Sequence, residues 1–240
     1  MTKHVVIVGG GYTGTCAAIQ LSRQARQPLD ITVIEQRASV GQGLAYSATD
    51  PDHRLNAPDM VHFVTPEDQD ALRRWFEDQG GPAFDAAADS GGDVLFIRRR
   101  DFGRFLREQF DAYQADNPSG STITHLQATA KDLEKADGDF LLGLDQAETL
   151  NADLVIVATS NERPAIPAPL RPVADHPAFL GDPWDRAALG AIPKTAAILL
   201  VGTALTAADV IVSCLREGHS GPITALSRHG LRSTRRAITP

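Results

Sequence analysis

The amino-terminal part of the chain opens with two short apolar runs separated by an amphipathic stretch. Residues 4–8 and 31–35 are rich in β-branched apolar side chains and have the length of buried strands. Residues 13–24, which lie between them, carry apolar side chains at helical spacing and predict a helix. A strand, a glycine-rich turn, a helix and a second strand in this order predict a βαβ unit.

The same pattern returns near the carboxyl end, where residues 197–227 predict a strand, a helix and a strand. The separation of Gly9 and Glu35 is 26 positions (35 − 9), and that of Gly202 and Arg228 is also 26 (228 − 202). In both units the first residue follows a strand and the last residue lies at the tip of the next strand. The sequence therefore predicts two βαβ units of the same dimensions.

The region between the two units is less regular. It predicts helices at residues 66–79 and 101–115, antiparallel strands within residues 122–150, a hairpin turn at Asp137-Gly138 and a buried strand at residues 154–158. A proline-rich segment follows. The buried side of the 101–115 helix is expected to consist of Phe102, Phe105, Leu106, Phe110 and Tyr113.

Composition excludes several classes of protein. Of the 240 residues, 42% are apolar and 22% are charged, as in ordinary globular proteins. A net charge of −7 argues against nucleic acid as a partner, because phosphate binding needs a basic face. Neither a membrane-spanning segment nor a signal peptide is evident, so we expect a cytoplasmic location, with a homo-oligomer left open. Cys16 and Cys214 are expected to be reduced packing residues within helices.

A glycine fingerprint follows the first predicted strand. Gly9, Gly11 and Gly14 satisfy GxGxxG, the pattern of dinucleotide-binding turns. The first glycine allows the tight turn, the second lets a pyrophosphate approach the backbone, and the third lets the helix pack on the strand. Tyr12 and Thr13 lie at the amino end of the predicted helix, which attracts phosphate. We expect these five residues to bind the diphosphate of a dinucleotide.

An acidic residue, Glu35, ends the second predicted strand, and Gln36 follows it. A carboxylate at this position accepts hydrogen bonds from both ribose hydroxyls and selects adenosine without a 2′-phosphate. The motif alone does not separate FAD from NAD. A second glycine-rich loop at residues 41–46, which contains Gly43, could lie against the rest of a long cofactor, or it could be a plain surface loop. Asn56 could place its amide near an isoalloxazine ring.

The second predicted unit keeps only part of the fingerprint. Gly202 and Thr203 follow the strand, but Ala204 and Ala207 replace the second and third glycines. The methyl group of Ala204 obstructs the approach of a pyrophosphate, whereas a small residue suffices at the third position. Arg228 stands at the acidic position of the first unit and favours the 2′-phosphate of NADPH. We expect this unit to bind NAD(P)H, and a degenerate structural repeat is the alternative.

These stretches resemble the FAD/NAD(P)-binding protein family that includes FAD-dependent urate hydroxylase-like proteins. More broadly they are similar to flavoproteins with two dinucleotide-binding folds, such as N-hydroxylating monooxygenases. The resemblance is carried by VVIVGGGYTG, GQGLAY, LNAP, RRRDFGRFL, ADLVIVATS and VGTALTAAD, which extend over most of the chain. It implies reduction of FAD by NAD(P)H, followed by oxygen activation and hydroxylation of a small molecule.

The chain departs from this family in sequence and in length. Ser160 and Ala204 stand where the family has glycine, and both changes count against full nicotinamide-dependent activity. Family members are longer, because their second nucleotide domain continues and the chain then returns to the FAD domain with a Gly-Asp pair for the flavin. The resemblance therefore implies a truncated product or a shortened relative.

The predicted fold class is α/β. A Rossmann-like, three-layer FAD-binding domain with an antiparallel β-meander is expected at residues 1–162, a proline-rich linker at 163–195, and a partial second Rossmann-like unit for NAD(P)H at 196–240. The predicted function is that of an FAD-dependent, NAD(P)H-dependent oxidoreductase, monooxygenase-like, with a small-molecule substrate.

Two other functions remain open from sequence. One is a non-catalytic dinucleotide-binding protein, and the other is an NAD-dependent dehydrogenase that uses the first site for NAD. No pattern identifies a catalytic acid, base or nucleophile, since GxSxG and HxxxH are absent and no CxxxxC pair follows the first unit. A bound flavin would therefore carry the redox chemistry.

Overall fold

The computed structural model describes residues 2–136, 138–145, 148–160 and 165–232. The polypeptide forms two compact units, Met1–Ser160 and Asn161–Pro240, and each is described by itself. The functional division of the chain at residues 162 and 195 stays a prediction. Within the described residues no helix is both long enough and apolar enough to span a bilayer.

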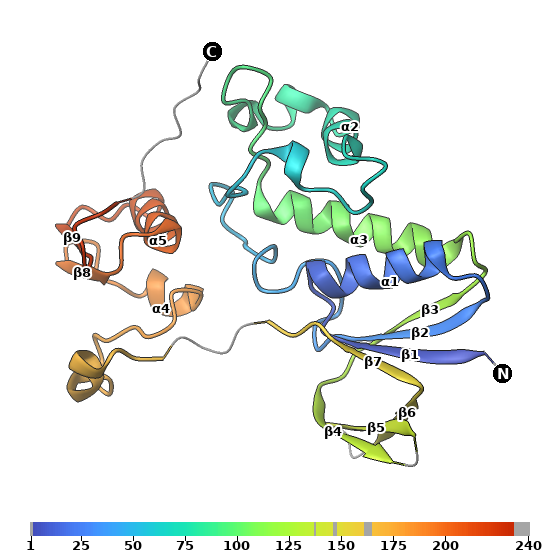
Figure 1. Cartoon of the computed structure of the whole chain (residues 1–240). Helices are drawn as coiled ribbons and strands as arrows, with labels where there is room; N and C mark the ends of the chain where they lie inside the picture. Colours follow the sequence, from blue (N-terminus) through green and yellow to red (C-terminus); the bar gives the residue numbers. More distant parts are fainter. Residues whose placement is uncertain (1, 137, 146–147, 161–164, 233–240) are drawn as a thin grey trace. The chain divides into compact units, whose positions relative to one another are not determined.

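The first unit is built on a four-stranded parallel sheet. Its strands are β1 (Lys3–Val8), β2 (Leu29–Ile34), β3 (Thr122–Leu126) and β7 (Leu154–Val157), in the order β3-β2-β1-β7 (Figure 1). The predicted βαβ unit is confirmed, because β1 and β2 pair in parallel. The prediction of antiparallel pairing from residue 122 onward is wrong for β3, since this strand follows a long crossover helix and therefore runs parallel to β2.

Two further layers cover the two faces of this sheet. Helices α1 (Tyr12–Gln24) and α3 (Arg99–Ala115) lie side by side on one face (Figure 1). The antiparallel strands β4 (Ala130–Ala136), β5 (Asp139–Leu144) and β6 (Thr149–Ala152) form the predicted meander on the other face. The predicted three-layer α/β fold is thus confirmed. Asp137, half of the predicted hairpin turn, lies outside the described residues.

The two faces of the sheet have separate apolar cores, because successive side chains of a strand point to opposite sides. Ile7 of β1 packs on the helical side with Ala18 and Phe110, and Val6 packs on the meander side with Leu142. A third core fills the space between the helices and the segment of residues 55–97. Its buried members are Ile19, Leu55, Val64, Leu72, Trp75, Phe76, Ala88, Leu95, Ile97, Phe102, Phe105 and Leu106.

Helix α3 carries the buried face that its spacing predicts. Phe102, Phe105, Leu106 and Phe110 are fully buried, whereas Tyr113 is half-buried at the edge of two cores. The apolar stripe binds the helix to the sheet on one side and to the irregular segment on the other. The helix therefore joins the two parts of the first unit.

The segment before α3 is less helical than predicted. The helix expected at residues 66–79 is confirmed only as α2 (Ala71–Asp78), because a turn closed by Asp68 N and Thr65 O at 3.0 Å precedes it. The rest consists of turns and three short 3-10 helices, η1 (Asp59–Val61), η2 (Gly81–Ala83) and η3 (Ala86–Ala88).

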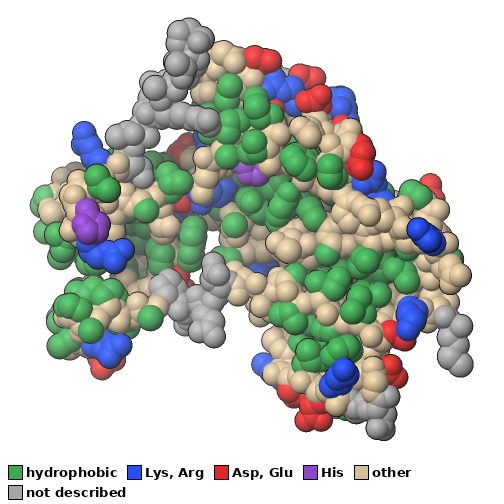
Figure 2. Space-filling model, in the orientation of Figure 1, with side chains coloured by type: hydrophobic (Ala, Val, Ile, Leu, Met, Phe, Trp, Pro, Cys, Tyr) green, Lys and Arg blue, Asp and Glu red, His purple; other side chains and the backbone are tan. Residues whose placement is uncertain are grey.

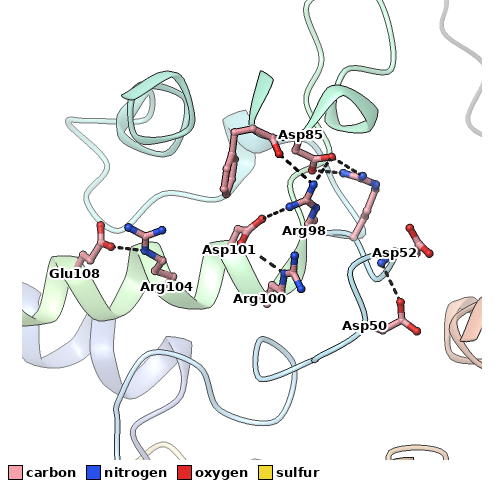
Figure 3. Close-up of polar contacts among 10 residues, drawn as sticks. Asp50, Asp52, Asp85, Arg98, Arg100, Asp101, Arg104 and Glu108 are labelled. Atoms are coloured by element: carbon pink, nitrogen blue, oxygen red, sulfur yellow. Dashed lines mark hydrogen bonds and ion pairs between the residues drawn. The ribbon is translucent and has the colours of Figure 1, made fainter. Parts of the chain in front are cut away.

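A buried carboxylate ties this segment to the start of α3. Asp85 accepts two hydrogen bonds from Arg54, at 2.8 and 2.9 Å, and lies 3.0 Å from the guanidinium of Arg98 (Figure 3). Burial alone would raise the pKa of Asp85, but hydrogen bonds and charge attraction from Arg54, and then from Arg98, hold this pKa below its usual value. The ionised form is therefore the one that the fold stabilises.

Strand β7 is less buried than its apolar sequence predicts. It is the last strand of the described sheet, and Leu154 and Val157 are 47% and 65% exposed. Ile156 faces the helical side, where it lines an open groove with Leu21 and Leu29. Figure 2 shows hydrophobic side chains at the surface over this part of α1 and the sheet. The expectation of a fully buried strand is wrong, because β7 has a neighbour on one side only.

The second unit contains the repeated βαβ motif. Strands β8 (Ile198–Val201) and β9 (Ile223–Leu226) pair in parallel, and α5 (Leu205–Arg216) connects them. α5 packs on one face of this pair through a small core of Leu189, Val210 and Cys214. The unit also contains α4 (Arg186–Gly190) and the 3-10 helix η4 (Ala168–Val173). The second βαβ unit predicted from the sequence is confirmed.

Replacing Asp85 by Asn is expected to destabilise the first unit by about 3 kcal/mol, because the half-buried Arg54 loses its carboxylate partner and the half-buried Arg98 keeps only Asp101. Since the folded-state pKa of Asp85 is depressed, its contribution to stability in the parent is present above pH 4 and is lost as the pH falls below about 4. Urea unfolding at several pH values measures both effects.

The exposed pair of Asp68 and Arg74 provides a matched control. An Asp68→Asn change should cost less than about 1 kcal/mol. Equal costs for Asp85→Asn and Asp68→Asn would show that the buried cluster does not hold the segment in place.

Candidate functional site

The glycine turn lies where the order of the sheet reverses. β1 has β2 on one side and β7 on the other, and the turn of Gly9, Gly10 and Gly11 follows its carboxyl end. Gly9 has φ +106°, and a Cβ there would lie 2.5 Å from the carbonyl oxygen of Ala158, just after β7. Only glycine fits this position. Open α/β sheets bind ligands at such a switch point.

Gly14 brings α1 against the turn. A Cβ on Gly14 would overlap the carbonyl oxygen of Gly9, so any side chain would push the helix away from the strand. Ala18, one helical turn later, is fully buried on the same face. The structure thus shows the close helix–strand packing expected of the third glycine.

Gly11 is the N-cap residue of α1, which begins at Tyr12. It has φ −73° and ψ −168°, and no side chain caps the helix there. A Cβ on Gly11 would meet only the Cα of Gly43, at an ordinary contact distance of 3.6 Å. Because the first N–H groups of a helix have no intrahelical acceptor, those of Tyr12, Thr13 and Gly14 can bind an anion here.

Glu35 is bonded to the turn itself. Its carboxylate is 6% exposed; Oε2 accepts from the N–H of Gly10 at 3.1 Å, and Oε1 accepts from the backbone and side-chain nitrogens of Arg37, both at 3.0 Å. A carboxylate oxygen has two acceptor positions, so Oε2 keeps one for a further donor such as a ribose hydroxyl. Gln36, also expected at this site, is exposed, and its carbonyl accepts from Gln127 at 3.3 Å.

The loop at residues 41–46 is clamped between the turn and α3. The N–H of Gly41 donates to the carbonyl of Gly10 at 2.7 Å, and a Cβ on Gly43 would lie 3.1 Å from the Cα of Gly11. On its other side, a Cβ on Gly103 of α3 would lie 2.5 Å from the carbonyl oxygen of Tyr46. The loop is therefore a fixed wall beside the turn.

An aromatic cluster continues from the turn toward α3. The ring of Tyr12 lies 6.4 Å from that of Tyr46 and 5.9 Å from that of Phe102, and His62 packs on Phe102 at 5.2 Å. Tyr12 donates to the carbonyl of Phe63 at 2.7 Å, and burial raises its pKa well above the usual value. The side chain of Tyr12 thus serves packing, which leaves its backbone N–H as the group for a ligand.

Cys16 lies on α1 beside this cluster and is a free thiol. Burial raises the pKa of this thiol to about 11. At neutral pH it therefore stays protonated and acts as a packing residue, as expected from the sequence. Cys214 in the second unit is also free, and burial raises its pKa.

Asn56 is exposed on the segment before η1, and the buried Arg99 donates to its Oδ1 at 2.6 Å. Sequence patterns did not predict Arg99 or Arg37 as site residues. The sequence does contain a signal for Arg37, because a cation two residues after the acidic residue Glu35 can pair with its carboxylate. Arg99 lies within an arginine triplet, Arg98 to Arg100, in which periodicity does not show which member is buried.

The turn of the second unit is similar to the first in backbone dihedral angles at its first and third residues. Gly202 has φ +123°, and Ala204, the N-cap residue of α5, has φ −81° and ψ −172°, close to the values of Gly11. Thr203 donates from its hydroxyl to the carbonyl of Leu231. The prediction that Arg228 stands at the position of Glu35 is wrong by one residue. Gly9 N bonds to Ile34 O and Gly202 N bonds to Leu226 O, so Ser227 corresponds to Glu35, and the exposed Arg228 is the next residue.

The residues predicted for the first site lie around one turn. Gly9, Gly11 and Gly14 form it, Glu35 bonds to it, and Gly43 lies against it. Asn56 lies on another segment, which Arg99 ties to α3. Within the described residues, no three His, Cys, Asp or Glu side chains are grouped to hold a metal ion.

This turn at the reversal point of a parallel sheet defines a dinucleotide-binding α/β protein. The chain belongs to the FAD-NAD(P)-binding family, whose sequence profile matches residues 6–162. The matched region covers almost all of the first unit. A comparison with curated proteins finds no match.

Solved structures with a similar fold include three flavin-related enzymes. The cadaverine monooxygenase DfoA of Erwinia amylovora, bound to FAD, has a TM-score of 0.63 and 12% identity over 94% of this chain. The ornithine N-hydroxylase KtzI of Kutzneria sp. 744 has a TM-score of 0.60 and 17% identity over 94% of this chain. A flavin monooxygenase of Stenotrophomonas maltophilia has a TM-score of 0.56 and 15% identity over 93% of this chain. The chain spans 50%, 53% and 57% of these proteins, respectively.

Two glycine-to-alanine changes in the first turn should differ in how much they change stability. Gly14→Ala is expected to cost about 3 kcal/mol, because the new methyl group overlaps the backbone of Gly9. Gly11→Ala should stay within about 1 kcal/mol of the parent, because its φ is ordinary and its surroundings are open. Thermal or urea unfolding measures both, and a stable Gly14→Ala protein would contradict the packing described for α1.

Proposed function

We propose that the first unit binds FAD and that the chain is the FAD-binding part of an NAD(P)H-dependent flavin oxidoreductase, monooxygenase-like, that acts on a small molecule. The observation that carries the proposal is the turn at Gly9 to Gly14, with the buried carboxylate of Glu35 bonded to Gly10. The backbone fits a dinucleotide, because two glycines have no room for a side chain and the third leaves the helix end uncapped.

Each part of the turn has a separate task in this proposal. The amino end of α1 would hold the pyrophosphate through the N–H groups of Tyr12, Thr13 and Gly14. Glu35 would accept a ribose hydroxyl through the free position of Oε2. FAD, once bound, would supply the electron-transfer chemistry between NAD(P)H and the substrate.

The residues around the turn favour a long cofactor such as FAD over a shorter mononucleotide. The loop at residues 41–46 and the aromatic residues Tyr12 and Tyr46 extend from the turn toward Arg99 and Asn56. A cofactor that runs along this wall would present its far half to an exposed amide. The FAD in the DfoA structure and the reduced FAD and NADP⁺ in the KtzI structure belong to proteins of similar fold.

The second unit is proposed as the NAD(P)H site. Gly202 has a positive φ like Gly9, Ala204 has dihedral angles close to those of Gly11, and the exposed Arg228 lies one residue beyond the position that corresponds to Glu35. The methyl group of Ala204 works against this assignment, because it stands where a pyrophosphate would approach the backbone. A degenerate repeat without nucleotide is therefore the competing function for this unit.

Mixing the purified chain with FAD is expected to give a yellow protein whose flavin absorbance survives desalting. Gly11→Ala should weaken FAD binding at least about tenfold, a loss of about 1.4 kcal/mol, without a comparable loss of stability. Glu35→Gln should weaken it as well, because a neutral amide accepts more weakly from a ribose hydroxyl. Isothermal titration measures the three affinities.

Three results would contradict this assignment. A chain that stays colourless and binds no adenine nucleotide supports the non-catalytic alternative. A chain that binds NADH in the first unit, with loss of binding in Gly11→Ala, supports the dehydrogenase alternative. Unchanged FAD affinity in both variants would show that the flavin binds elsewhere.

Arg228→Glu is expected to weaken NADPH binding at least about tenfold and to leave NADH binding nearly unchanged, because only NADPH carries the 2′-phosphate. Fluorescence titration with both nucleotides measures the effect, and NADH serves as the internal control. A parent chain that binds neither nucleotide would favour the degenerate repeat. Equal losses for both nucleotides would contradict the role of Arg228 in selecting NADPH.

A further inference from the structure

A short antiparallel ladder positions the segment that carries Asn56. The N–H of Leu55 donates to the carbonyl of Ile97 at 2.9 Å, and the N–H of Arg99 donates to the carbonyl of His53 at 2.9 Å. Arg54 and Arg98 face each other as a β-bridge between these bonds. The residue after this ladder, Asn56, is therefore fixed relative to the start of α3.

Arg99 adds side-chain contacts to this ladder from a buried position. It is 7% exposed, its Nε donates to the carbonyl of Arg54 at 2.9 Å, and its Nη2 donates to Oδ1 of Asn56 at 2.6 Å. A guanidinium only donates hydrogen bonds, so the amide oxygen of Asn56 must be the atom that faces it. Arg99 thus decides which way the amide points.

The amide nitrogen of Asn56 consequently points away from Arg99. Asn56 is exposed, and within the described part of the chain its Nδ2 donates to no acceptor. This nitrogen carries two hydrogens, and its position is fixed because Arg99 holds the oxygen of the same amide. An exposed donor of this kind is suited to an acceptor atom on a ligand.

The pair lies beside the aromatic wall of the first unit. The charge of Arg99 acts on the hydroxyl of Tyr46, whose pKa is raised by burial and lowered by this guanidinium, with burial the larger effect. The ring of Tyr46 lies 6.4 Å from that of Tyr12, the first residue of α1. Asn56 and the glycine turn are therefore linked through consecutive contacts along one wall.

We propose that Arg99 is a positioning residue, which orients Asn56 so that its amide nitrogen donates a hydrogen bond to an acceptor on the flavin half of FAD. The acceptor class is a ring nitrogen or a carbonyl oxygen of the isoalloxazine. This inference rests on the proposed FAD binding, and it adds that this end of the site selects a hydrogen-bond acceptor. Arg99 itself acts through Asn56.

Asn56→Asp tests the direction of this hydrogen bond. Aspartate keeps an oxygen toward Arg99, so the ladder and the fold are retained, but it presents an oxygen in place of the outward donor. FAD affinity is expected to fall at least about tenfold, since an acceptor would then face an acceptor. ADP has no flavin half, so its affinity should stay within about twofold of the parent, which separates this effect from general charge repulsion.

Variants of the arginine triplet test the positioning role. Arg99→Met should weaken FAD binding without weakening ADP binding, and it should change the visible spectrum and the reduction potential of the bound flavin. Arg99→Lys keeps the charge and one donor and should restore part of the affinity. Arg100→Met is the matched control, because Arg100 is 43% exposed and pairs only loosely with Asp101, at 3.8 Å.

The outcomes separate this inference from the proposed function. If the parent binds FAD and Asn56→Asp binds it equally well, the inference is overturned and FAD binding stands. If Asn56→Asp weakens FAD and ADP alike, the amide does not act at the flavin half, and the inference is again overturned. If the parent binds neither FAD nor ADP, the proposed function and the inference fail together.

Discussion

The contact between α1 and the carboxyl end of β1 is the constraint on which the rest of the first unit depends. Gly14 brings the helix so close to Gly9 that no side chain fits between them, and Gly9 brings the turn equally close to the end of β7. Glu35 then ties the tip of β2 to the same turn through the N–H of Gly10. Three strands and one helix therefore meet at a bend made only of backbone.

This bend also determines the position of the surrounding segments. Because Gly41 and Gly43 lie directly against it, the loop that carries them cannot move without opening the turn. α3 holds the same loop from the other side through Gly103, and the arginines at its start hold the segment of residues 53–56. Arg98 lies between Asp85 and Asp101 in this arrangement (Figure 3). The wall beside the turn is thus held by contacts within the first unit.

Local patterns predicted the two βαβ units, the three layers and the buried face of α3, since each depends on residues close together in sequence. The parallel orientation of β3 could not be predicted from its own residues, because it depends on the crossover made by α3. The exposure of β7 depends on which strands stand beside it, and the apolar sequence does not contain that information. Arg99 was missed because burial of one arginine among three is decided by distant partners, the carbonyl of Arg54 and the amide of Asn56.

A comparison of the two turns separates the backbone shape of a turn from the space that it leaves for a ligand. Ala204 has nearly the same dihedral angles as Gly11, so the shape of the bend does not require glycine at this position. What the missing side chain gives Gly11 is clearance above the backbone. A family of such proteins could therefore exchange nucleotide occupancy at either bend through a single methyl group, while the architecture around it stays the same.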